Sequence, residues 1–476
     1  MTAAGEPWGR RCAGWHRPEQ IRSEFQMITD RQGNAWTGAT VDALSHFDAA
    51  IEAFNLYRGD PVALADAAVD AAPEFVMAQL FKAYLFGLAT EPEATREAIT
   101  LVDGVRGMAM ADIERSHVVA LDLLLANNWT AAAVALDRHT MRWPHDLVAL
   151  QAGHLMDFYR ANCRDLRDRI ARALPKWSDD RPGYSIVLGM YAFGLEEAGD
   201  YARAEAMGRA ALARQPLDSW APHAVAQVME MQGRAQDGIG WMQAREPYWA
   251  GDSNFIQVHN WWHKALCHLD LEQREIVLQL YDERVGAGDS VVALDLVDAS
   301  ALLWRAQKEG VEVGDRWNSV AERWTQHADG ALYPFNDWHA AMAYLGAGRE
   351  ADVDRILARY QSNDGAETET RRWARRTGRP LIEGFQAFWH GRYADAVEAL
   401  HGARYIVNSF GGSHAQRDVI DWTLTEAAIR AGLSETAEAF ANERLALKPH
   451  SPVNRRFLRR AKSVGAAPRA GADLAA

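Results

Sequence analysis

The sequence predicts an all-α protein in which degenerate helix–turn–helix repeats stack into a curved α-solenoid. Three observations lead to this fold class. From about residue 41 onward, apolar residues recur at spacings of three and four, which is the period of amphipathic helices. Gly, Pro, Asn or Asp interrupts this pattern roughly every 12–18 residues, and no run of alternating β-branched residues competes with it.

The third observation is a short phrase that recurs at the predicted helix corners. It consists of a turn residue, an aromatic or small residue two positions later, and Ala about three positions after that. In one copy, Gly199 permits the turn, Tyr201 closes the corner and Ala204 lets two helix axes approach closely. Copies of the phrase begin, in chain order, near Gly59, Asn127, Gly199, Gly233, Glu272, Gly348, Gly391 and Gly432.

This phrase is typical of tetratricopeptide helix–turn–helix units, for which a period of about 34 residues is expected. The copies are unevenly spaced, so the repeats are expected to be degenerate or interrupted by longer connections. An irregular all-α bundle with chance matches is the alternative.

The chain is expected to form one array with two extensions. Residues 1–40 are an N-terminal segment, residues 41–462 form the solenoid, and residues 463–476, which are rich in Ala and Gly, form a flexible tail. Polar, turn-rich breaks occur at 175–183 and 362–370. Both are too short for interdomain tethers and are interpreted as loops within the array.

Composition excludes several classes of function. A net charge of −13 without a basic arm disfavours nucleic-acid binding. Cys12, Cys163 and Cys267 lie far apart, so neither a disulfide framework nor a thiolate zinc site is expected, and a reducing cytoplasm fits best. The chain has no apolar run of about 18 residues, so no membrane span is expected. A homo-oligomer is left open.

Candidate functional residues gather in three segments, of which the first is DSWAPHAVAQVMEM at 218–231. Trp220, His223, Gln227 and Glu230 follow one another at spacings of three and four, so they share one face of a helix. Counting back from the corner at Gly233 turns this face toward the concave surface of the array.

The second segment is FIQVHNWWHKALCH at 255–268. His259 and His263 have the spacing that lets two imidazoles on one helical face hold a metal ion. Asn260 stands where an HExxH zinc enzyme has its general base. Hydrogen-bonded or ligand-contacting histidines are therefore preferred, no cofactor is expected, and a divalent metal is the alternative. Candidates for a third metal ligand are His223, Glu230, Asp295, Asp298 and His339.

The third segment joins FNDWH at 335–339 with GGSHAQRD at 411–418. Ser413 and Gln416 have the spacing of a capping box. Arg417 lies in the first turn of the next helix, where a cation is disfavoured, so an anionic ligand or a fixed carboxylate partner would explain it. Arg404 is a candidate for the same anion site.

The sequence resembles the tetratricopeptide repeat protein 38 family from about residue 43 to residue 461. The words DSWAPHAVAQVMEM, HNWWHKAL, VDASALLWR, FNDWH, GARYIVNSFGGSHAQRD and LALKPHSP occur in the order of the family. The resemblance implies an all-helical, tetratricopeptide-like architecture and brings no established activity. Family members have more His around the first word. Gln227 and Met229 depart from that pattern, which weakens a multi-histidine metal site.

Two classes of function remain, together with a purely structural interpretation of the three segments. The first is a binding protein whose concave face or pocket holds a protein or peptide segment or a small acidic ligand. The second is an enzyme that uses a His/Asp/Glu/Arg pocket for acid–base or metal-assisted, hydrolase-like chemistry. No GxSxG, GxxxxGK[ST] or strand-borne GxGxxG motif supports a particular enzyme class. The candidate ligand-binding residues are Trp220, His223, Glu230, His259, Asn260, His263, Asp298, Asn336, His339, Arg404, Gln416, Arg417 and Asp418.

Overall fold

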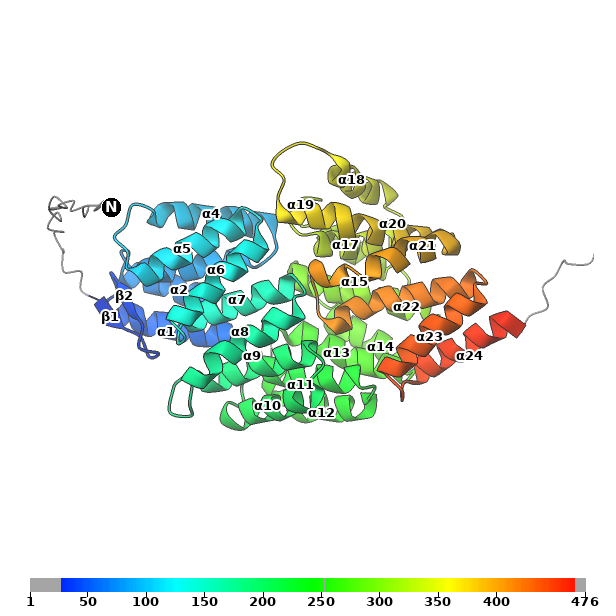
Figure 1. Ribbon diagram of the computed structural model, residues 1–476, viewed down its shortest axis with the longest axis horizontal. Coiled ribbons are helices and arrows are strands. Elements are labelled where there is room, and N and C mark those ends of the chain that lie inside the picture. Colours follow the sequence, from blue (N-terminus) through cyan, green and yellow to red (C-terminus); the bar gives the residue numbers. More distant parts are fainter. Residues whose placement is uncertain (1–26, 252, 467–476) are drawn as a thin grey trace, which may run out of the picture.

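The computed structural model describes residues 27–251 and 253–466, and nearly all of its regular structure is helical (Figure 1). Successive helices form antiparallel pairs, from α1 with α2 to α22 with α23, and the pairs stack side by side. The prediction of an all-α solenoid of tetratricopeptide-like helix pairs is confirmed. Among the described residues, no helix has the length and the apolar character needed to cross a membrane.

The helices of the first half are α1 (Val41–Leu56), α2 (Pro61–Ala71), α3 (Val76–Gly87), α4 (Pro92–Val105), α5 (Asp112–Leu125), α6 (Trp129–Arg142), α7 (Leu147–Tyr159), α8 (Cys163–Ala173), α9 (Tyr184–Glu197), α10 (Tyr201–Arg214), α11 (Trp220–Met231) and α12 (Ala235–Trp249). Those of the second half are α13 (Gln257–Asp270), α14 (Arg274–Leu280), α15 (Ala293–Lys308), α16 (Arg316–Trp324), α17 (Pro334–Gly346), α18 (Glu350–Gln361), α19 (Glu369–Trp373), α20 (Arg379–Trp389), α21 (Tyr393–Arg404), α22 (His414–Arg430), α23 (Ser434–Leu447) and α24 (Pro452–Ala466).

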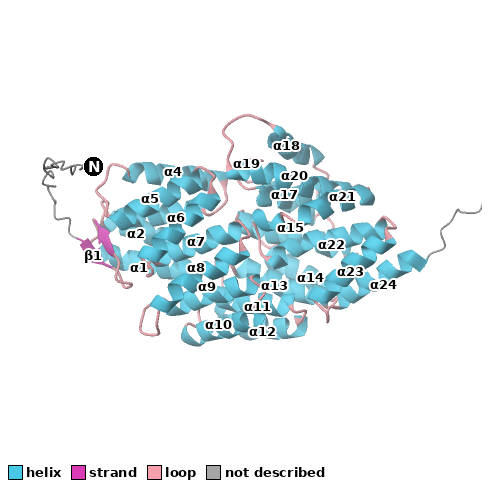
Figure 2. Ribbon diagram, viewed as in Figure 1, coloured by secondary structure: helices cyan, strands magenta, loops and turns pink. Residues whose placement is uncertain are grey.

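A two-stranded hairpin precedes the first helix and was not predicted (Figure 2). Strand β1 (Met27–Thr29) pairs with β2 (Ala35–Thr37) in antiparallel fashion. Asp30 accepts hydrogen bonds from Gln32 N and from Trp36 Nε1, both at 2.9 Å, so one carboxylate orders the turn and anchors a buried indole. Cys12 and the rest of residues 1–26 lie outside the described residues.

The corner between the two helices of a pair contains a residue with positive φ, and this residue marks the repeat. It is Gly at 199, 233, 310, 348, 391 and 432, but Tyr57, Thr90, Asn127, Ala161 and Glu272 occupy the equivalent place in other pairs. The marked residues follow one another at spacings of 33 to 43 residues. The longer spacings arise where loops such as residues 177–183 and 362–368 connect one pair to the next.

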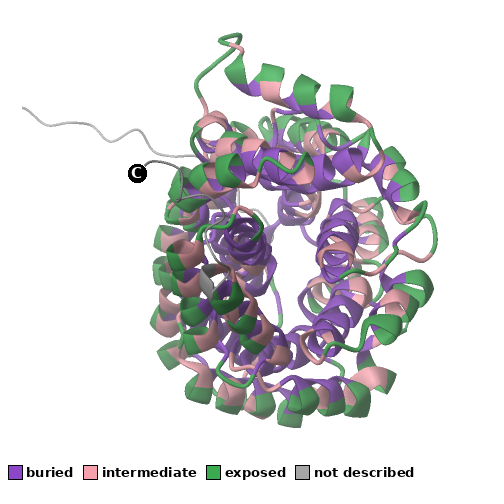
Figure 3. Cartoon of the chain, turned by 90° about the vertical axis from the view of Figure 1, so that its right-hand side faces the viewer, coloured by how far each residue is buried: buried purple, intermediate pink, exposed green. Residues whose placement is uncertain are grey.

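The first helix of a pair lies inside the array and the second lies outside. Residues of α7, α9, α11, α15 and α17 are buried on every face, whereas outer helices such as α6, α8, α10 and α18 bury a single stripe. Figure 3 shows buried residues on the inside of the array and exposed residues on its outside. The outer helices therefore show one apolar stripe, while the inner helices are buried all round and carry buried polar residues among their apolar ones.

The array curves until its first corners touch its second half. Phe255 N, just before α13, donates to Tyr57 O at 2.9 Å. Asn336 Nδ2, on α17, donates to Thr90 O at 3.0 Å, and Ala293 N, at the start of α15, donates to Glu91 Oε1 at 2.9 Å. These last two bonds join residues that are 246 and 202 positions apart in the chain. The two halves of the array are therefore in direct contact at these corners.

Candidate functional site

Three histidines from two neighbouring inner helices meet in the interior. His223 lies in the first turn of α11, and His259 and His263 lie one turn apart on α13. One ring nitrogen of each lies within 4.8 Å of the others, and all three side chains are buried. Of the five residues considered as a third partner for the histidine pair, the structure places His223 in the cluster.

Two carboxylates accept hydrogen bonds from the Nδ1 atoms of the two histidines on α13. His259 Nδ1 donates to Asp298 Oδ2, on α15, at 2.7 Å, and His263 Nδ1 donates to Glu230 Oε2, on α11, at 3.0 Å. Both bonds keep the proton on Nδ1 and leave the Nε2 lone pair available. His259 Nε2 lies 3.0 Å from His223 Nε2, so His223 supplies the proton of that bond.

These three histidines form the histidine cluster. Several polar atoms of the cluster, of Asp298 and of Asn260, the residue after His259, are buried without a hydrogen-bond partner among the described residues. They are His223 Nδ1, His263 Nε2, Asp298 Oδ1 and both side-chain polar atoms of Asn260. Burial, followed by the neighbouring imidazoles, holds the pKa of His223 well below its usual value. Burial and His259 do the same for His263. Neutral imidazoles are the form that can accept a proton or bind a metal.

A cavity of about 570 Å³ lies beside the histidine cluster, between the first helix pairs and the start of α15. His223 and His259 form part of its wall, together with Trp220, whose ring stacks on that of Tyr57 at a centroid distance of 5.2 Å. The rest of the wall is mostly apolar and includes Phe54, Leu85, Phe86, Leu155, Phe158 and Leu294. A cavity of this size and character suits a small organic molecule.

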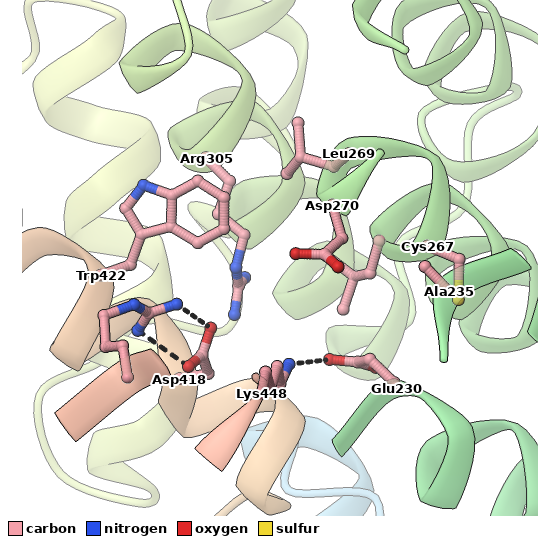
Figure 4. Close-up of a pocket in the computed structure, with 11 residues that line it drawn as sticks. Glu230, Ala235, Cys267, Leu269, Asp270, Arg305, Asp418, Trp422 and Lys448 are labelled. Carbon is pink, nitrogen blue, oxygen red and sulfur yellow. Dashed lines mark hydrogen bonds and ion pairs between the residues drawn. The ribbon is translucent and has the colours of Figure 1, made fainter. Parts of the chain in front are cut away.

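A second, much smaller cavity lies behind Glu230 and is lined by charges (Figure 4). Lys448 Nζ donates to Glu230 Oε1 at 3.3 Å, and Arg444 donates to both oxygens of Asp418 at 2.9 and 3.2 Å. Asp270 and Arg305 complete the charged wall. Its volume of about 20 Å³ has room for one water-sized molecule. We interpret this charged network as structural, because Lys448 and Arg444 pair with Glu230 and Asp418, while Asp270 accepts from Ser451 and Arg305 donates to Ala415 O. The pair with Lys448 also fixes Glu230 and the imidazole bound to it.

Several other candidate residues on the inner helices lie apart from the histidine cluster. Asn336 donates to Thr90, as described above, and His339 Nδ1 donates to Phe335 O of its own helix at 2.8 Å. Asp295 accepts from Ser290 Oγ at 2.6 Å. All of these side chains therefore have a fixed partner within the protein.

The residues around Ser413 also have fixed partners. Gln416 completes the capping box with Ser413. Arg417 donates to the carbonyl oxygen of Gly412 and, at 3.3 Å, to Glu197 Oε2. Arg404 pairs with Asp421 at 2.8 Å and with Glu443. Of the two explanations for these arginines, the structure thus provides the fixed carboxylate partner.

Sequence reasoning missed part of the site. Tyr57 and Arg58 in the cavity wall lie at the corner near Gly59, where the repeat phrase is weak and no polar motif marks the residues.

A buried pair of glutamates was also missed. Gln227 Nε2 donates to Glu196 and Glu197, both at 2.8 Å, and these glutamates are buried at the end of an inner helix. Burial, followed by the charge of Glu197, raises the pKa of Glu196 well above its usual value. A Glu-Glu pair before a Gly corner resembles an exposed helix end, so sequence alone could not reveal it.

Comparisons with known proteins give distant similarities. No protein-family model matches the chain. Among solved structures, the APC/C hetero-tetramer Cut9-Hcn1 is similar at 13% identity and a TM-score of 0.42, over 88% of this chain and 76% of that chain. The human IFIT1 dimer with PPP-AAAA is similar at 12% identity and a TM-score of 0.37, over 89% of this chain and 90% of that one. The same dimer with m7Gppp-AAAA gives 12% identity and a TM-score of 0.38, over 90% and 96%. These identities and TM-scores are low, and the fold of this chain is defined by its own helix pairs and corners.

Proposed function

We propose that the protein binds a small amphipathic acid, meaning an apolar molecule with one acidic group, in the cavity beside the histidine cluster. The observation that carries this proposal is a largely apolar cavity of about 570 Å³ with two imidazoles in its wall. Apolar walls supply the binding energy of such sites, and a few fixed polar groups supply orientation.

The charged residues of the wall favour an acidic ligand. Arg58 donates to the backbone carbonyl of Tyr248 at 2.6 Å, so a backbone carbonyl rather than a carboxylate accepts this bond. The two acidic residues are already engaged: Asp60 caps α2 and Glu91 accepts from Ala293 N. A ligand carboxylate beside Arg58 would therefore gain a charge-assisted hydrogen bond.

A small molecule suits the interior better than an extended peptide. A peptide groove in a helical array requires inner helices that expose one face along the concave side. Here α7, α9, α11, α15 and α17 are buried on every face, and the first corners close against the second half. These features favour an enclosed ligand.

Isothermal titration with decanoate and decan-1-ol tests the proposal. Both should bind with a negative heat-capacity change, because both bury apolar surface. Ala53→Trp, which fills the cavity from α1, should abolish both, whereas Ala71→Trp at the exposed end of α2 should abolish neither. Arg58→Gln should weaken decanoate alone by about 10-fold or more. Equal binding by the two tryptophan variants would overturn the proposal.

Hydrolysis of an ester of such an acid is the second candidate, and one arrangement favours it. Asp298, His259 and His223 form a continuous hydrogen-bonded chain that ends at the cavity wall. Such a chain can take a proton from a water or hydroxyl group and stabilise the imidazolium that forms. The test is hydrolysis of 4-nitrophenyl decanoate. Asp298→Asn should lower kcat with little change in decanoate affinity. If the wild type hydrolyses the ester no faster than Asp298→Asn, the catalytic function is rejected.

We also propose that residues 41–462 act as one body, that the protein belongs to the tetratricopeptide repeat protein 38 family, and that it works in the cytoplasm. The order of the matching sequence words supports the family. The free thiols of Cys163 and Cys267 support a reducing compartment.

A further inference from the structure

The histidine cluster has a property that binding of an organic ligand does not require. Its three rings lie close together: the ring centroids of His223, His259 and His263 lie 4.7 to 4.8 Å apart pairwise. Two of their ring nitrogens, His223 Nδ1 and His263 Nε2, are buried without a hydrogen-bond partner among the described residues, which is unfavourable unless something binds them.

The hydrogen bonds from His259 and His263 to carboxylates orient these two rings as metal ligands. A metal-binding imidazole usually donates its remote N–H to a carboxylate or a carbonyl, which fixes the tautomer and directs the other nitrogen at the ion. His259 donates Nδ1–H to Asp298 and His263 donates Nδ1–H to Glu230. Two carboxylates next to the rings also offset the charge of a buried cation.

An unpartnered atom points to the same ligand. His263 is only 1% exposed, and its Nε2 atom has no hydrogen-bond partner among the described residues. Because Nδ1 of this ring carries the proton, Nε2 has a free lone pair. A metal ion would satisfy it. For His223 to bind the same ion through Nε2, its proton would move from Nε2 to Nδ1, and the metal would replace the hydrogen bond between His223 and His259.

We propose that one ring nitrogen each of His223, His259 and His263 binds a divalent first-row metal ion, of which zinc fits best. Three neutral imidazole nitrogens suit zinc, which binds them at about 2.0–2.1 Å and keeps a fourth position for water or a ligand atom. This inference deepens the proposed function, since His223 and His259 line the cavity and the ion would lie in its wall. It rests on the histidine cluster and does not need the amphipathic acid to be correct.

Cobalt titration of the chelator-treated, full-length protein tests the site. The wild type should bind one equivalent of Co²⁺ with visible ligand-field bands, and Zn²⁺ should displace it. His263→Ala should weaken binding by more than about 100-fold, since a ligand is lost. His268→Ala is the matched control: this residue follows on the same helix, hydrogen-bonds to Gln273 and should bind Co²⁺ like the wild type.

A second variant separates a metal role from a packing role. Asp298→Asn keeps the shape of the side chain and should retain one equivalent of Co²⁺ with about 10- to 100-fold lower affinity. A wild type that shows no ligand-field bands and retains no metal overturns the proposal, and so does equal binding by His263→Ala and His268→Ala. If His263→Ala fails to fold, the wild-type titration decides alone.

Decanoate binding to the metal-free protein keeps this inference distinct from the proposed function. Decanoate binding without Co²⁺ binding would overturn the metal site only. Co²⁺ binding without decanoate binding would overturn the amphipathic ligand only.

Discussion

At the scale of single residues, polar side chains of the inner helices have hydrogen-bond partners either within one helical turn or far away in the chain. Capping by Ser413 and Gln416 could be predicted from the sequence, because both partners lie within one turn. The partner of Arg417 could not, because Glu197 lies 220 residues away. The sequence likewise showed that His259 and His263 share a face, whereas only the fold brings Asp298 to the first of them. Residue types suggested a site, and long-range pairing determined its composition.

Asp337 offers a pH-dependent test of such a buried pairing. Its carboxyl accepts from Gly330 N at 3.1 Å and from Tyr360 OH at 2.8 Å, and burial, followed by Asp329, raises its pKa to about 8. Between about pH 4 and about pH 8 the folded protein keeps a proton that the unfolded chain has lost. The free energy of unfolding should therefore fall as pH rises, by up to about 1.4 kcal/mol per pH unit.

Asp337→Asn should remove this contribution, because an amide does not titrate in this range. Urea unfolding at about pH 5 and about pH 8 should show a smaller loss of stability in the variant than in the wild type. Asp354→Asn, an exposed position on α18, is the control and should follow the wild type. Parallel pH profiles for Asp337→Asn and the wild type would show that the buried carboxyl is ionised throughout.

At the scale of helices, the corner residue explains how much of the repeat pattern could be predicted. Corners at Gly199, Gly233, Gly391 and Gly432 show the expected glycine in the left-handed region. At Thr90 and Ala161 a non-glycine residue takes the same conformation, so the sequence carries no signal there. Such residues strain the backbone and need tertiary contacts to hold them. This is why the fold class could be predicted while repeat boundaries could not.

The interface of α10 with its neighbouring helices includes small residues, which Ala204→Leu would test. Ala204 is 1% exposed, and one turn later a Cβ on Gly208 would lie 2.5 Å from Val225 Cγ2. A leucine at 204 should overpack this interface and lower stability by roughly 1–3 kcal/mol. Ala206→Leu on the exposed face of the same helix is the matched control. Thermal unfolding should separate the two variants, and equal melting temperatures would mean that Ala204 does not fill the interface.

At the scale of the whole molecule, closure of the array creates the candidate ligand cavity. Its wall combines the first helix pairs with the starts of α11 and α15, which lie far apart in the chain. The local period of three and four predicts each helix, but it says nothing about how far the array curves. The sequence could therefore predict inner helices that carry the three polar segments. It could not predict that these segments border a largely apolar cavity, because small rotations between successive helix pairs determine that arrangement.

Asn336→Ala tests whether closure holds the cavity together. Asn336 is buried and donates to both Thr90 O and Thr90 Oγ1, at 3.0 and 3.1 Å, and Thr90 sits at a strained corner with φ of 59°. Loss of the amide strands a buried carbonyl and should cost about 1–3 kcal/mol. Leu88, Ala89 and Glu91 flank this corner and line the cavity. Hydrogen exchange across residues 88–95 should accelerate, and decanoate binding should weaken.

A second closure contact supplies the control for this prediction. Thr130 N donates to Glu369 Oε2 at 2.7 Å, and the Thr130 hydroxyl bonds to the same carboxylate, outside the cavity wall. Thr130→Val removes the hydroxyl bond to Glu369 and the bond that this hydroxyl accepts from Arg160 at 3.3 Å, and it keeps the bond from Thr130 N. Hydrogen exchange at residues 88–95 and decanoate affinity should therefore match the wild type. Faster exchange in Asn336→Ala with unchanged decanoate affinity would separate closure from ligand binding. Unchanged exchange would show that the remaining contacts between the halves, rather than this amide, maintain the closed array.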